Sequence, residues 1–433
     1  MTSNRDINAF PGDLSGLIFP ADYLSLAACG VDFLTRAFRQ TGVLTDAERV
    51  SRIDALTPFE GGSTGRKAML WVSYESDNAS LAKKLFVKFS RDFDDPARDL
   101  TRVQMASEIY MAQLSIVSDF PVVIPRCFFA DYHAETGSGI LITEQVLFGE
   151  AGIEPLMSKS VDHMYANPAS YYRLVLDKLG TLAGAHSAGK FPAVVKEWFP
   201  YAPEKLLVNV RKPPSVAELD AKIDLLERFI SAFGALLPTT LTASDLIPSL
   251  REGVPLVVAS ESLIFQELAA DPSYIALCHW NAQLDNAWFW RDADNTLQCG
   301  LMDWGNAGQL NVAMAIWGCL CGAQTDLWDG IDDFVDVFVT AFRRAGGQPL
   351  SRTRVVAHLD LYIAHMGVRY MLDVPAYISS RLPADCRPAD YLDPYIQTDE
   401  RMRSQLAIFT NFLGRWLRRD YTSMMRELTL TQY

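Results

Sequence analysis

The sequence predicts an α+β protein with two lobes, a small β-rich N-terminal lobe and a large, mainly helical C-terminal lobe. The chain has 433 residues, more than a single simple core usually holds. Strand-like segments gather between residues 51 and 148, and helical periodicity dominates afterwards. We therefore expect an N-terminal helical extension over 1–50, a β-rich lobe over 51–148 and a helical lobe over 149–433.

The composition is that of an ordinary folded protein. Hydrophobic residues make up 49% of the chain and charged residues 21%, which is not typical of a disordered protein. The 52 acidic residues outnumber the 39 Lys and Arg residues, and the formal net charge is −13. This balance argues against non-specific nucleic-acid binding and is compatible with a cationic or neutral small-molecule ligand.

The sequence shows no targeting or membrane segment. The start, MTSNRDINAFPGDLSG, has no basic region leading into an apolar run, as a signal peptide would have. The longest strongly apolar run, Val312 to Ala323, has about half of the ~20 residues that a membrane span requires. We expect a cytoplasmic protein with no membrane span.

The predicted elements follow from the change between helical and strand periodicity. Apolar spacing indicates helical segments from Leu14 to Gly42. The rest of the N-terminal third is expected to hold strands at 52–57, 68–75 and 85–90, a helix at 98–117, and strands within 120–132 and 139–146. In the C-terminal part we expect helices at 171–189, 216–237, 249–270, 352–372 and 404–428, with short strands at 287–291 and 297–302.

A glycine-rich hairpin, FEGGSTGRK, spans residues 59–67 between two predicted strands. Its glycines would let backbone amides approach phosphate oxygens closely, and its two hydroxyl residues would add donors. A hairpin with no ligand is the alternative, because such sequences are common. The candidate phosphate-binding residues are Gly61, Gly62, Ser63, Thr64 and Gly65.

The predicted strand LFVKFS carries a lysine among apolar residues. Strand alternation places Lys88 on the face opposite Leu85 and Val87. A lysine there requires a partner or an anionic ligand, unless it lies at an edge with its ammonium in water. Glu108 is the one carboxylate between positions 102 and 118 of the following helix, so we predict a Lys88–Glu108 pair.

Polar residues cluster in two short segments, CHWNAQLDNAWFW from Cys278 and GLMDWGNAG from Gly300. Asn286 and Asp303 offer an amide and a carboxylate oxygen, which are ligands that magnesium takes. His279 would orient the first loop by hydrogen bonding. Each residue alone is more often a loop polar group or a cap, but the joint pattern is much rarer.

This joint pattern resembles the aminoglycoside phosphotransferase and choline kinase superfamily, with its H-x-D-x-x-x-x-N loop and the following I-D-W or I-D-F turn. Within it, the loop HWNAQLDNAWFW is most similar to the ecdysteroid-kinase-like branch. The segment that starts FLTRAFRQTGVLT and the helix LGTLAGAHSAG also resemble that family. The matches extend from about residue 30 to 310 and imply a bilobal protein-kinase-like fold.

The resemblance implies that Mg²⁺ and ATP bind between the lobes and that a hydroxyl group of a small molecule is phosphorylated. Lys88 and Glu108 would anchor the phosphates, and Asn286 and Asp303 would bind the metal. The backbone near Glu144 and Val146, in ILITEQVLFGE, would hydrogen-bond the adenine, although any strand that leaves a core can have the same sequence pattern.

Position 281 is where the family has its catalytic aspartate, and this sequence has Asn281. An amide cannot accept a proton as a carboxylate does. One hypothesis is a phosphotransferase in which Asn281 only orients the hydroxyl, with Asp285 nearby in sequence. The alternative is a pseudokinase that binds nucleotide and serves as a binding or regulatory protein. Nucleotidyl transfer is a third hypothesis, and nothing in the sequence specifically favours it.

The acceptor is the least determined part. The resemblance implies a sterol-like or other hydroxylated molecule, whereas the acidic balance leaves an amino-sugar or choline-like alcohol open. Aromatic residues of the 190–270 region could line an apolar acceptor pocket, but we favour the simpler interpretation that they belong to the helical core. These residues are Trp198, Phe199, Phe229 and Phe233.

Overall fold

The computed structural model describes residues 7–59, 61, 64–117, 119–202, 213–242, 245–383 and 385–430. Two compact units make up the chain. Unit 1 comprises Met1–Pro155, Phe191–Pro200 and Trp288–Gly308, and unit 2 comprises Leu156–Lys190, Tyr201–Ala287 and Gln309–Tyr433. The predicted mixture of a β-rich N-terminal region and a helical C-terminal region is confirmed.

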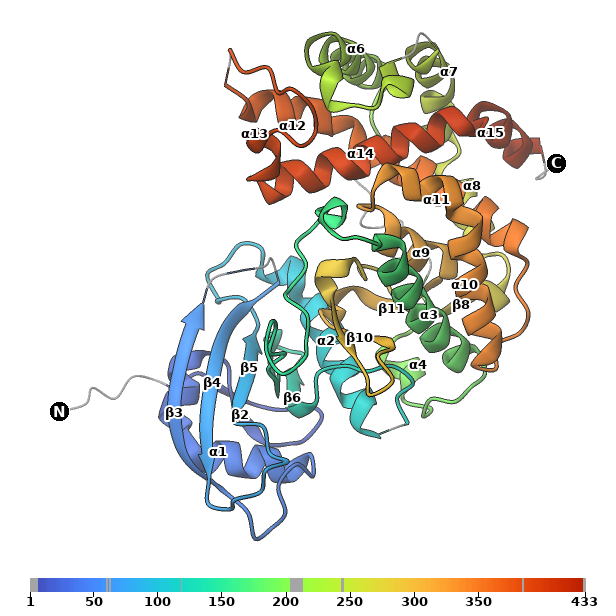
Figure 1. Ribbon diagram of the computed structural model, residues 1–433. Coiled ribbons are helices and arrows are strands. Elements are labelled where there is room, and N and C mark those ends of the chain that lie inside the picture. The colour runs from blue at the N-terminus through green and yellow to red at the C-terminus, as the bar shows by residue number, and fades with distance from the viewer. Residues whose placement is uncertain are drawn as a thin grey trace. The chain divides into compact units, whose positions relative to one another are not determined.

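Unit 1 is built around a five-stranded antiparallel sheet with the order β3-β4-β5-β7-β6 (Figure 1). Its strands are β3 (Val50–Phe59), β4 (Arg66–Tyr74), β5 (Lys84–Phe89), β6 (Cys127–His133) and β7 (Ser138–Glu144). The other main elements of its first part are β1 (Ala9–Pro11), β2 (Ile18–Pro20), α1 (Tyr23–Gln40) and α2 (Arg98–Val117).

The two faces of this sheet pack against different helices. Leu85 and Val87 of β5 face the core that α1 covers through Phe33 and Phe38. The opposite face packs against α2, where Ile109 contacts a cluster of β6 and β7 side chains. Since side chains alternate along a strand, every second residue of β5 must face α2.

One sequence prediction in unit 1 was wrong, and one was too broad. Residues 14–22 are not helical, because β2 pairs there with β1 before α1 begins at Tyr23. The side chain of Asp22 caps α1 by accepting a hydrogen bond from the backbone N–H of Ser25 at 2.8 Å. The predicted strand within 120–132 starts only at Cys127.

A second, short hairpin of unit 1 consists of β9 (Ala287–Arg291) and β10 (Leu297–Leu301). The backbone N–H of Leu301 donates to the carbonyl of Val123 at 2.9 Å, so β10 is tied to the segment that follows α2. Gly300 is required there, because a Cβ atom would lie 2.1 Å from the Trp288 ring. This hairpin brings residues 302–306 close to α2, since Gln104 Nε2 lies 3.2 Å from Asn306 Oδ1.

Unit 2 is mainly helical (Figure 1). Its helices of eight residues or more are α3 (Pro168–Ser187), α6 (Val216–Phe233), α7 (Leu246–Ala259), α8 (Glu261–Ala269), α9 (Val312–Leu320), α10 (Ile331–Arg344), α11 (Arg352–Tyr370), α12 (Val374–Arg381), α14 (Glu400–Arg418) and α15 (Tyr421–Leu430). Two strands, β8 (Ile275–His279) and β11 (Ala307–Asn311), pair with each other. Neither strand was predicted from the sequence, and no separate helices were predicted at the positions of α9, α10 and α12.

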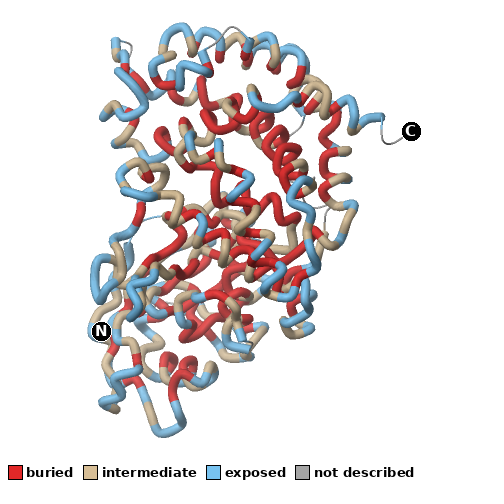
Figure 2. Tube along the Cα trace, turned by 45° about the vertical axis from the view of Figure 1, so that its right-hand side comes forward, coloured by how far each residue is buried: buried red, intermediate tan, exposed pale blue. Residues whose placement is uncertain are grey.

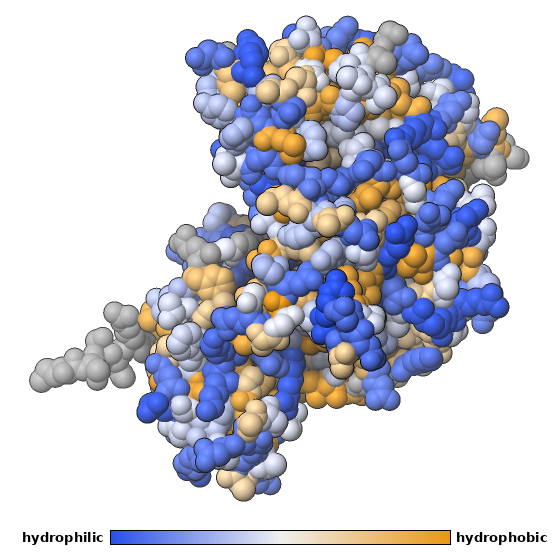
Figure 3. Space-filling view, in the orientation of Figure 1, coloured by the Kyte–Doolittle hydropathy of each residue, from blue (hydrophilic) through white to orange (hydrophobic). Residues whose placement is uncertain are grey.

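The apolar run of the sequence is the central helix α9, in which every residue is buried. α3 and α10 approach closely at Gly184, where a Cβ atom would lie 2.1 Å from the carbonyl oxygen of Phe342. In Figure 2 the trace of these helices is coloured as buried where it faces other elements and as exposed on the outer turns. None of the described helices is long and apolar enough to span a membrane, and hydrophilic residues are spread over the face in Figure 3.

Candidate active site

Unit 1 contains a buried lysine that is paired with two carboxylates. Lys88 is 2% exposed, and its Nζ contacts the carboxylate of Glu108 on α2. The same Nζ lies 3.4 Å from Oδ1 of Asp303, whose side chain is 43% exposed. The predicted Lys88–Glu108 contact is therefore present, and Asp303 joins it from a position 215 residues further along the chain.

Strand alternation explains why Lys88 meets this helix. Lys88 pairs in register with Leu141 of β7, on the face of the sheet that α2 covers. Burial alone would lower the pKa of Lys88, but the carboxylates of Glu108 and Asp303 outweigh it and raise that pKa. Lys88 is thus held in its charged form inside the unit, which would be costly without the two carboxylates that pair with it.

Asp303 lies in a strained turn directly after β10. Its φ is +59°, in the left-handed region that non-glycine residues seldom adopt. The turn is fixed by the next residue, because Trp304 Nε1 donates to the carbonyl of Leu301 at 3.2 Å. The turn leaves part of the Asp303 carboxylate exposed while its Oδ1 contacts Lys88, and local strain of this kind is common at functional sites.

The glycine-rich hairpin closes on Lys88 at one point. Gly65 packs so tightly that a Cβ atom would lie 2.2 Å from the carbonyl oxygen of Phe89 and 3.7 Å from Cε of Lys88. Thr64 is buried and Gly61 is exposed. Gly62 and Ser63 lie outside the described residues.

The candidate adenine-binding backbone lies at the end of β7. The N–H of Glu144 donates to the carbonyl of Arg126 at 2.8 Å, and the N–H of Gln145 donates to the carbonyl of Lys84 at 3.2 Å. Both amides are therefore engaged in the sheet. The groups that could serve an adenine ring are the carbonyl of Glu144 and the N–H of Val146.

Unit 2 carries the loop that follows β8. The buried ring of His279 accepts a hydrogen bond through Nδ1 from the backbone N–H of Asn281, at 3.3 Å. Asn286 donates from Nδ2 to the backbone carbonyl of Asn281 at 2.7 Å. This bond orients the amide of Asn286, so that its Oδ1 is the atom that could bind a cation.

The side chain of Asn281 is held by a residue that the sequence analysis did not identify. Gln283 Nε2 donates to Asn281 Oδ1 at 3.2 Å. The only feature of the sequence that could have indicated this contact is that Gln283 is polar and lies two positions after Asn281 in the same loop. Asp285 lies 3.7 Å from Lys159 and is 15% exposed, so this carboxylate is engaged by a lysine.

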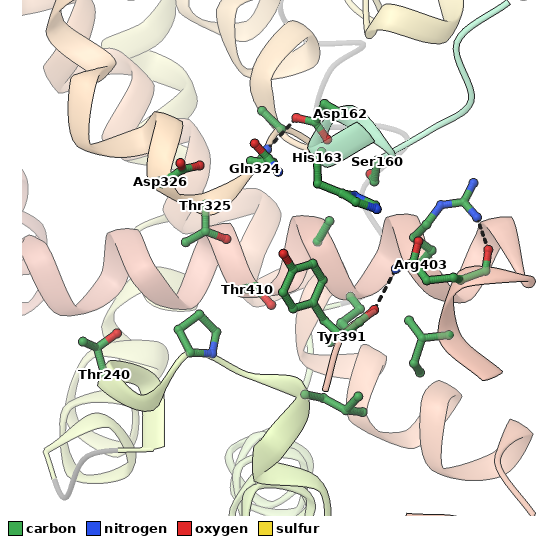
Figure 4. A pocket seen from close by; sticks show the side chains of 18 of the residues that line it. Ser160, Asp162, His163, Thr240, Gln324, Thr325, Asp326, Tyr391, Arg403 and Thr410 are labelled. Carbon is green, nitrogen blue, oxygen red and sulfur yellow. Dashed lines mark hydrogen bonds between the residues drawn. The ribbon is translucent and has the colours of Figure 1, made fainter. Parts of the chain in front are cut away.

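A cavity of about 420 Å³ opens in unit 2 among segments that are distant in sequence (Figure 4). Asp162, His163, Thr325 and Tyr391 surround it, and Gln324 N–H donates to Asp162 Oδ2 at 2.7 Å. Burial raises the pKa of Asp162, although this hydrogen bond and others act in the opposite direction. Apolar residues complete the lining, namely Leu236, Pro238, Ala323, Ile396, Leu406 and Ala407.

The cavity also adjoins the Asn281 loop. A Cβ atom at Gly322, which lines the cavity, would lie 2.7 Å from Oε1 of Gln283. Gln283 therefore lies between Asn281 and the cavity wall. In contrast, Trp198 stacks on Tyr110 within unit 1 and Phe229 is buried in unit 2. None of the four aromatic residues proposed from the sequence lines the cavity, as the core interpretation expects.

No family model and no curated protein matches the chain. Several solved structures of small-molecule kinases align with it. A choline kinase from Cryptosporidium parvum Iowa II aligns with 11% identity over 87% of this chain and 90% of that chain, at a TM-score of 0.38. A Plasmodium vivax ethanolamine kinase aligns with 14% identity over 84% and 83% of the two chains, at a TM-score of 0.40.

A spectinomycin phosphotransferase in complex with ADP and spectinomycin aligns with 11% identity over 84% of this chain and 93% of that chain, at a TM-score of 0.37. The chemistry of the side chains described above, not these overall alignments, supports the function proposed below.

Proposed function

We propose that the chain is an ATP-dependent phosphotransferase that acts on a hydroxyl group of a small molecule. The observation that carries this proposal is the charged Lys88, which is 2% exposed and contacts Glu108 and Asp303. A buried ammonium is strongly disfavoured unless ion pairs or an anionic ligand compensate it. Phosphoryl transfer needs such a cation against the phosphates and a carboxylate that can bind the metal.

Each candidate site residue of unit 1 has a role in this proposal. Lys88 binds phosphate oxygens, and Glu108 is a positioning residue that fixes the ammonium. The loop of Gly61 to Gly65 supplies backbone amides to the phosphates. The carbonyl of Glu144 and the N–H of Val146 hydrogen-bond the adenine edge.

Two oxygen ligands suit a magnesium ion, the partly exposed carboxylate of Asp303 and Oδ1 of Asn286. When bound, Mg²⁺ would neutralise charge on the phosphates and polarise the transferred phosphoryl group. The donation from Asn286 Nδ2 to Asn281 supports this role, because it presents the amide oxygen rather than the amide nitrogen.

Asn281 would act on the acceptor rather than on the nucleotide. Its Oδ1 accepts a hydrogen bond from Gln283 and has a second lone pair that can orient the acceptor hydroxyl. The acceptor oxygen bonds to the γ-phosphorus as the bond to the bridging oxygen of ADP breaks. The hydroxyl proton then passes to an oxygen of the transferred phosphoryl group. In a loose transition state this late transfer does not require a strong protein base.

We assign the unit 2 cavity to the acceptor. Its volume of about 420 Å³ suits a small molecule, and Gln283 connects its wall to Asn281. Two carboxylates, Asp162 and Asp326, line it. The lining arginines are already engaged, Arg403 with backbone carbonyls and Arg418 with Asp329. The exposed carboxylate of Asp326 is the lining charge that we propose for recognition of the acceptor, and it suits an alcohol that also bears an amino group better than a sterol-like acceptor.

The second candidate function is a pseudokinase that binds nucleotide without turnover. The observation that favours it is the hydrogen bond from Gln283 to Asn281 Oδ1, which occupies part of the carbonyl at the position expected to face the hydroxyl. It uses the same residues of unit 1, so nucleotide binding alone does not separate the two functions.

The test is transfer of label from γ-labelled ATP, with magnesium, to a panel of alcohols and amino alcohols. We expect transfer to at least one amino alcohol, complete loss in Asp303→Ala, and no change in Asp294→Ala, a matched change at an exposed turn of the same unit. Nucleotide binding with no transfer, and no activity gained in Asn281→Asp, would instead support the pseudokinase.

A further inference from the structure

A second lysine lies beside Lys88. Lys67 of β4 and Lys88 of β5 are direct cross-strand partners in the antiparallel register. Residues that are paired in this way project from the same face of a sheet, with Cβ atoms about 4.5–5.5 Å apart. Lys67 is half-buried and is the last residue of the glycine-rich hairpin, two residues after Gly65.

The charges around this pair are unbalanced in favour of an anion. Like charges directly opposite each other in a sheet are destabilising. Burial and the neighbouring Lys88 both lower the pKa of Lys67, and Asp303 and Glu108 only partly offset them. Within the described part of the chain, the structure shows Glu108 and Asp303 in contact with Lys88, and no ion pair or hydrogen bond of the Lys67 side chain.

The position of Lys67 also matches the hairpin proposed to hold phosphates. A cavity of about 780 Å³ in unit 1 is lined by Gly61, Gly65 and Lys67, whereas Lys88, Glu108 and Asp303 are not among its lining residues. If a metal ion binds to Asp303, that carboxylate is shared with the metal, and the two lysines retain Glu108 as their main anionic neighbour. The site then has an excess of positive charge that a polyphosphate would neutralise.

We propose that Lys67 is a second phosphate-binding lysine, so that the polyphosphate of the nucleotide is held by a cross-strand lysine pair rather than by Lys88 alone. This inference rests on the proposed function, because it requires a nucleotide in unit 1. Of the two lysines, Lys88 is fixed by Glu108, whereas Lys67 is free of such a fixed partner in the described residues and adjusts to the bound phosphates.

The chain offers a matched control. Lys84 is also on β5, but it is 43% exposed and lies 3.4 Å from Glu150, at the other end of the strand. Lys84→Met removes the same charge from the same sheet without touching the lysine pair. Lys67→Arg keeps the charge at position 67, so it should restore binding if charge is what matters.

The experiment is calorimetric titration of ATP and of AMP, with magnesium, into the full chain and its variants. Lys67→Met should weaken ATP binding about tenfold to hundredfold, the value of one charge-assisted hydrogen bond. AMP binding should change less than threefold, Lys67→Arg should recover most of the ATP affinity, and Lys84→Met should match the unmodified chain. The melting temperature of Lys67→Met should be equal to or higher than that of the unmodified chain, because a half-buried like charge beside Lys88 is removed.

The outcomes separate this inference from the function itself. ATP affinity of Lys67→Met equal to that of the unmodified chain, with a large loss in Lys88→Met, would overturn the lysine pair and leave the nucleotide site intact. A lower melting temperature with equal losses for ATP and AMP would also overturn it, because that pattern means a structural role. An unmodified chain that binds no ATP would overturn both proposals.

Discussion

Replacing Glu108 by Gln tests the energetic role of the buried ion pair most sharply. The change keeps the size and shape of the side chain and removes one charge, and the Glu108 side chain is only 8% exposed. Removing one partner of a buried pair typically costs about 3–5 kcal/mol, because an uncompensated charge stays inside. Asp303 remains 3.4 Å from Lys88, so we expect the low end, about 3 kcal/mol.

The assay is urea unfolding followed by circular dichroism, with the free energy taken from the midpoint at an unchanged slope. The double variant Lys88→Met/Glu108→Leu replaces both charges by apolar groups of similar volume, and it should be more stable than Glu108→Gln alone. A free energy of unfolding for Glu108→Gln within about 0.5 kcal/mol of that of the unmodified chain would refute the reasoning.

Three further predictions concern pH, packing and catalysis. The pKa of Lys88 is raised in the folded state, so the stability that its charge contributes should be fully present below its ordinary pKa of about 10.4 and lost as pH rises through the folded pKa. The melting-temperature difference between the unmodified chain and Lys88→Met should therefore be constant from about pH 7 to about pH 9.5 and shrink at higher pH. A difference that grows at high pH would contradict the raised pKa. Gly65→Ala should lower the free energy of unfolding by about 1–3 kcal/mol and weaken ATP binding, since its Cβ would lie 2.2 Å from a carbonyl oxygen. Gly308→Ala, with open space around the added Cβ, should leave the melting temperature and the ATP affinity in calorimetry unchanged. Asn281→Asp should change kcat little, because the proposed transition state needs no strong protein base, and a gain toward the roughly 10²-fold that a general base supplies would show that proton removal is limiting.

Local patterns in the sequence were sufficient for the Lys88–Glu108 pair. Alternation along one strand placed Lys88 on the face away from Leu85, and the following helix offered a single carboxylate. Helix α2 and strand β9 have the bounds that the sequence predicted. The alternative that Lys88 lies at an edge with its ammonium in water is wrong, because β5 is the central strand of the sheet.

Contacts that depend on tertiary structure were not accessible in this way. Asp303 follows β10, which is tied to Val123 by a contact between segments far apart in sequence, and it reaches Lys88 from there. The Lys67–Lys88 pairing depends on the register of β4 and β5, which the nine residues between these strands do not fix. The unit 2 cavity combines short segments around residues 162, 238, 324 and 403, none of which has a signal of its own.

Magnesium-dependent binding of ATP is the most direct test of the central claim, that unit 1 holds a nucleotide through Lys88, Glu108 and Asp303. Calorimetric titration with and without magnesium should show ATP binding that requires the metal. Asp303→Asn should lose that requirement and most of the affinity while keeping its fold, because asparagine tolerates the left-handed backbone at φ +59°. ATP binding that is absent, or that is the same with and without magnesium and in Asp303→Asn, would contradict the account.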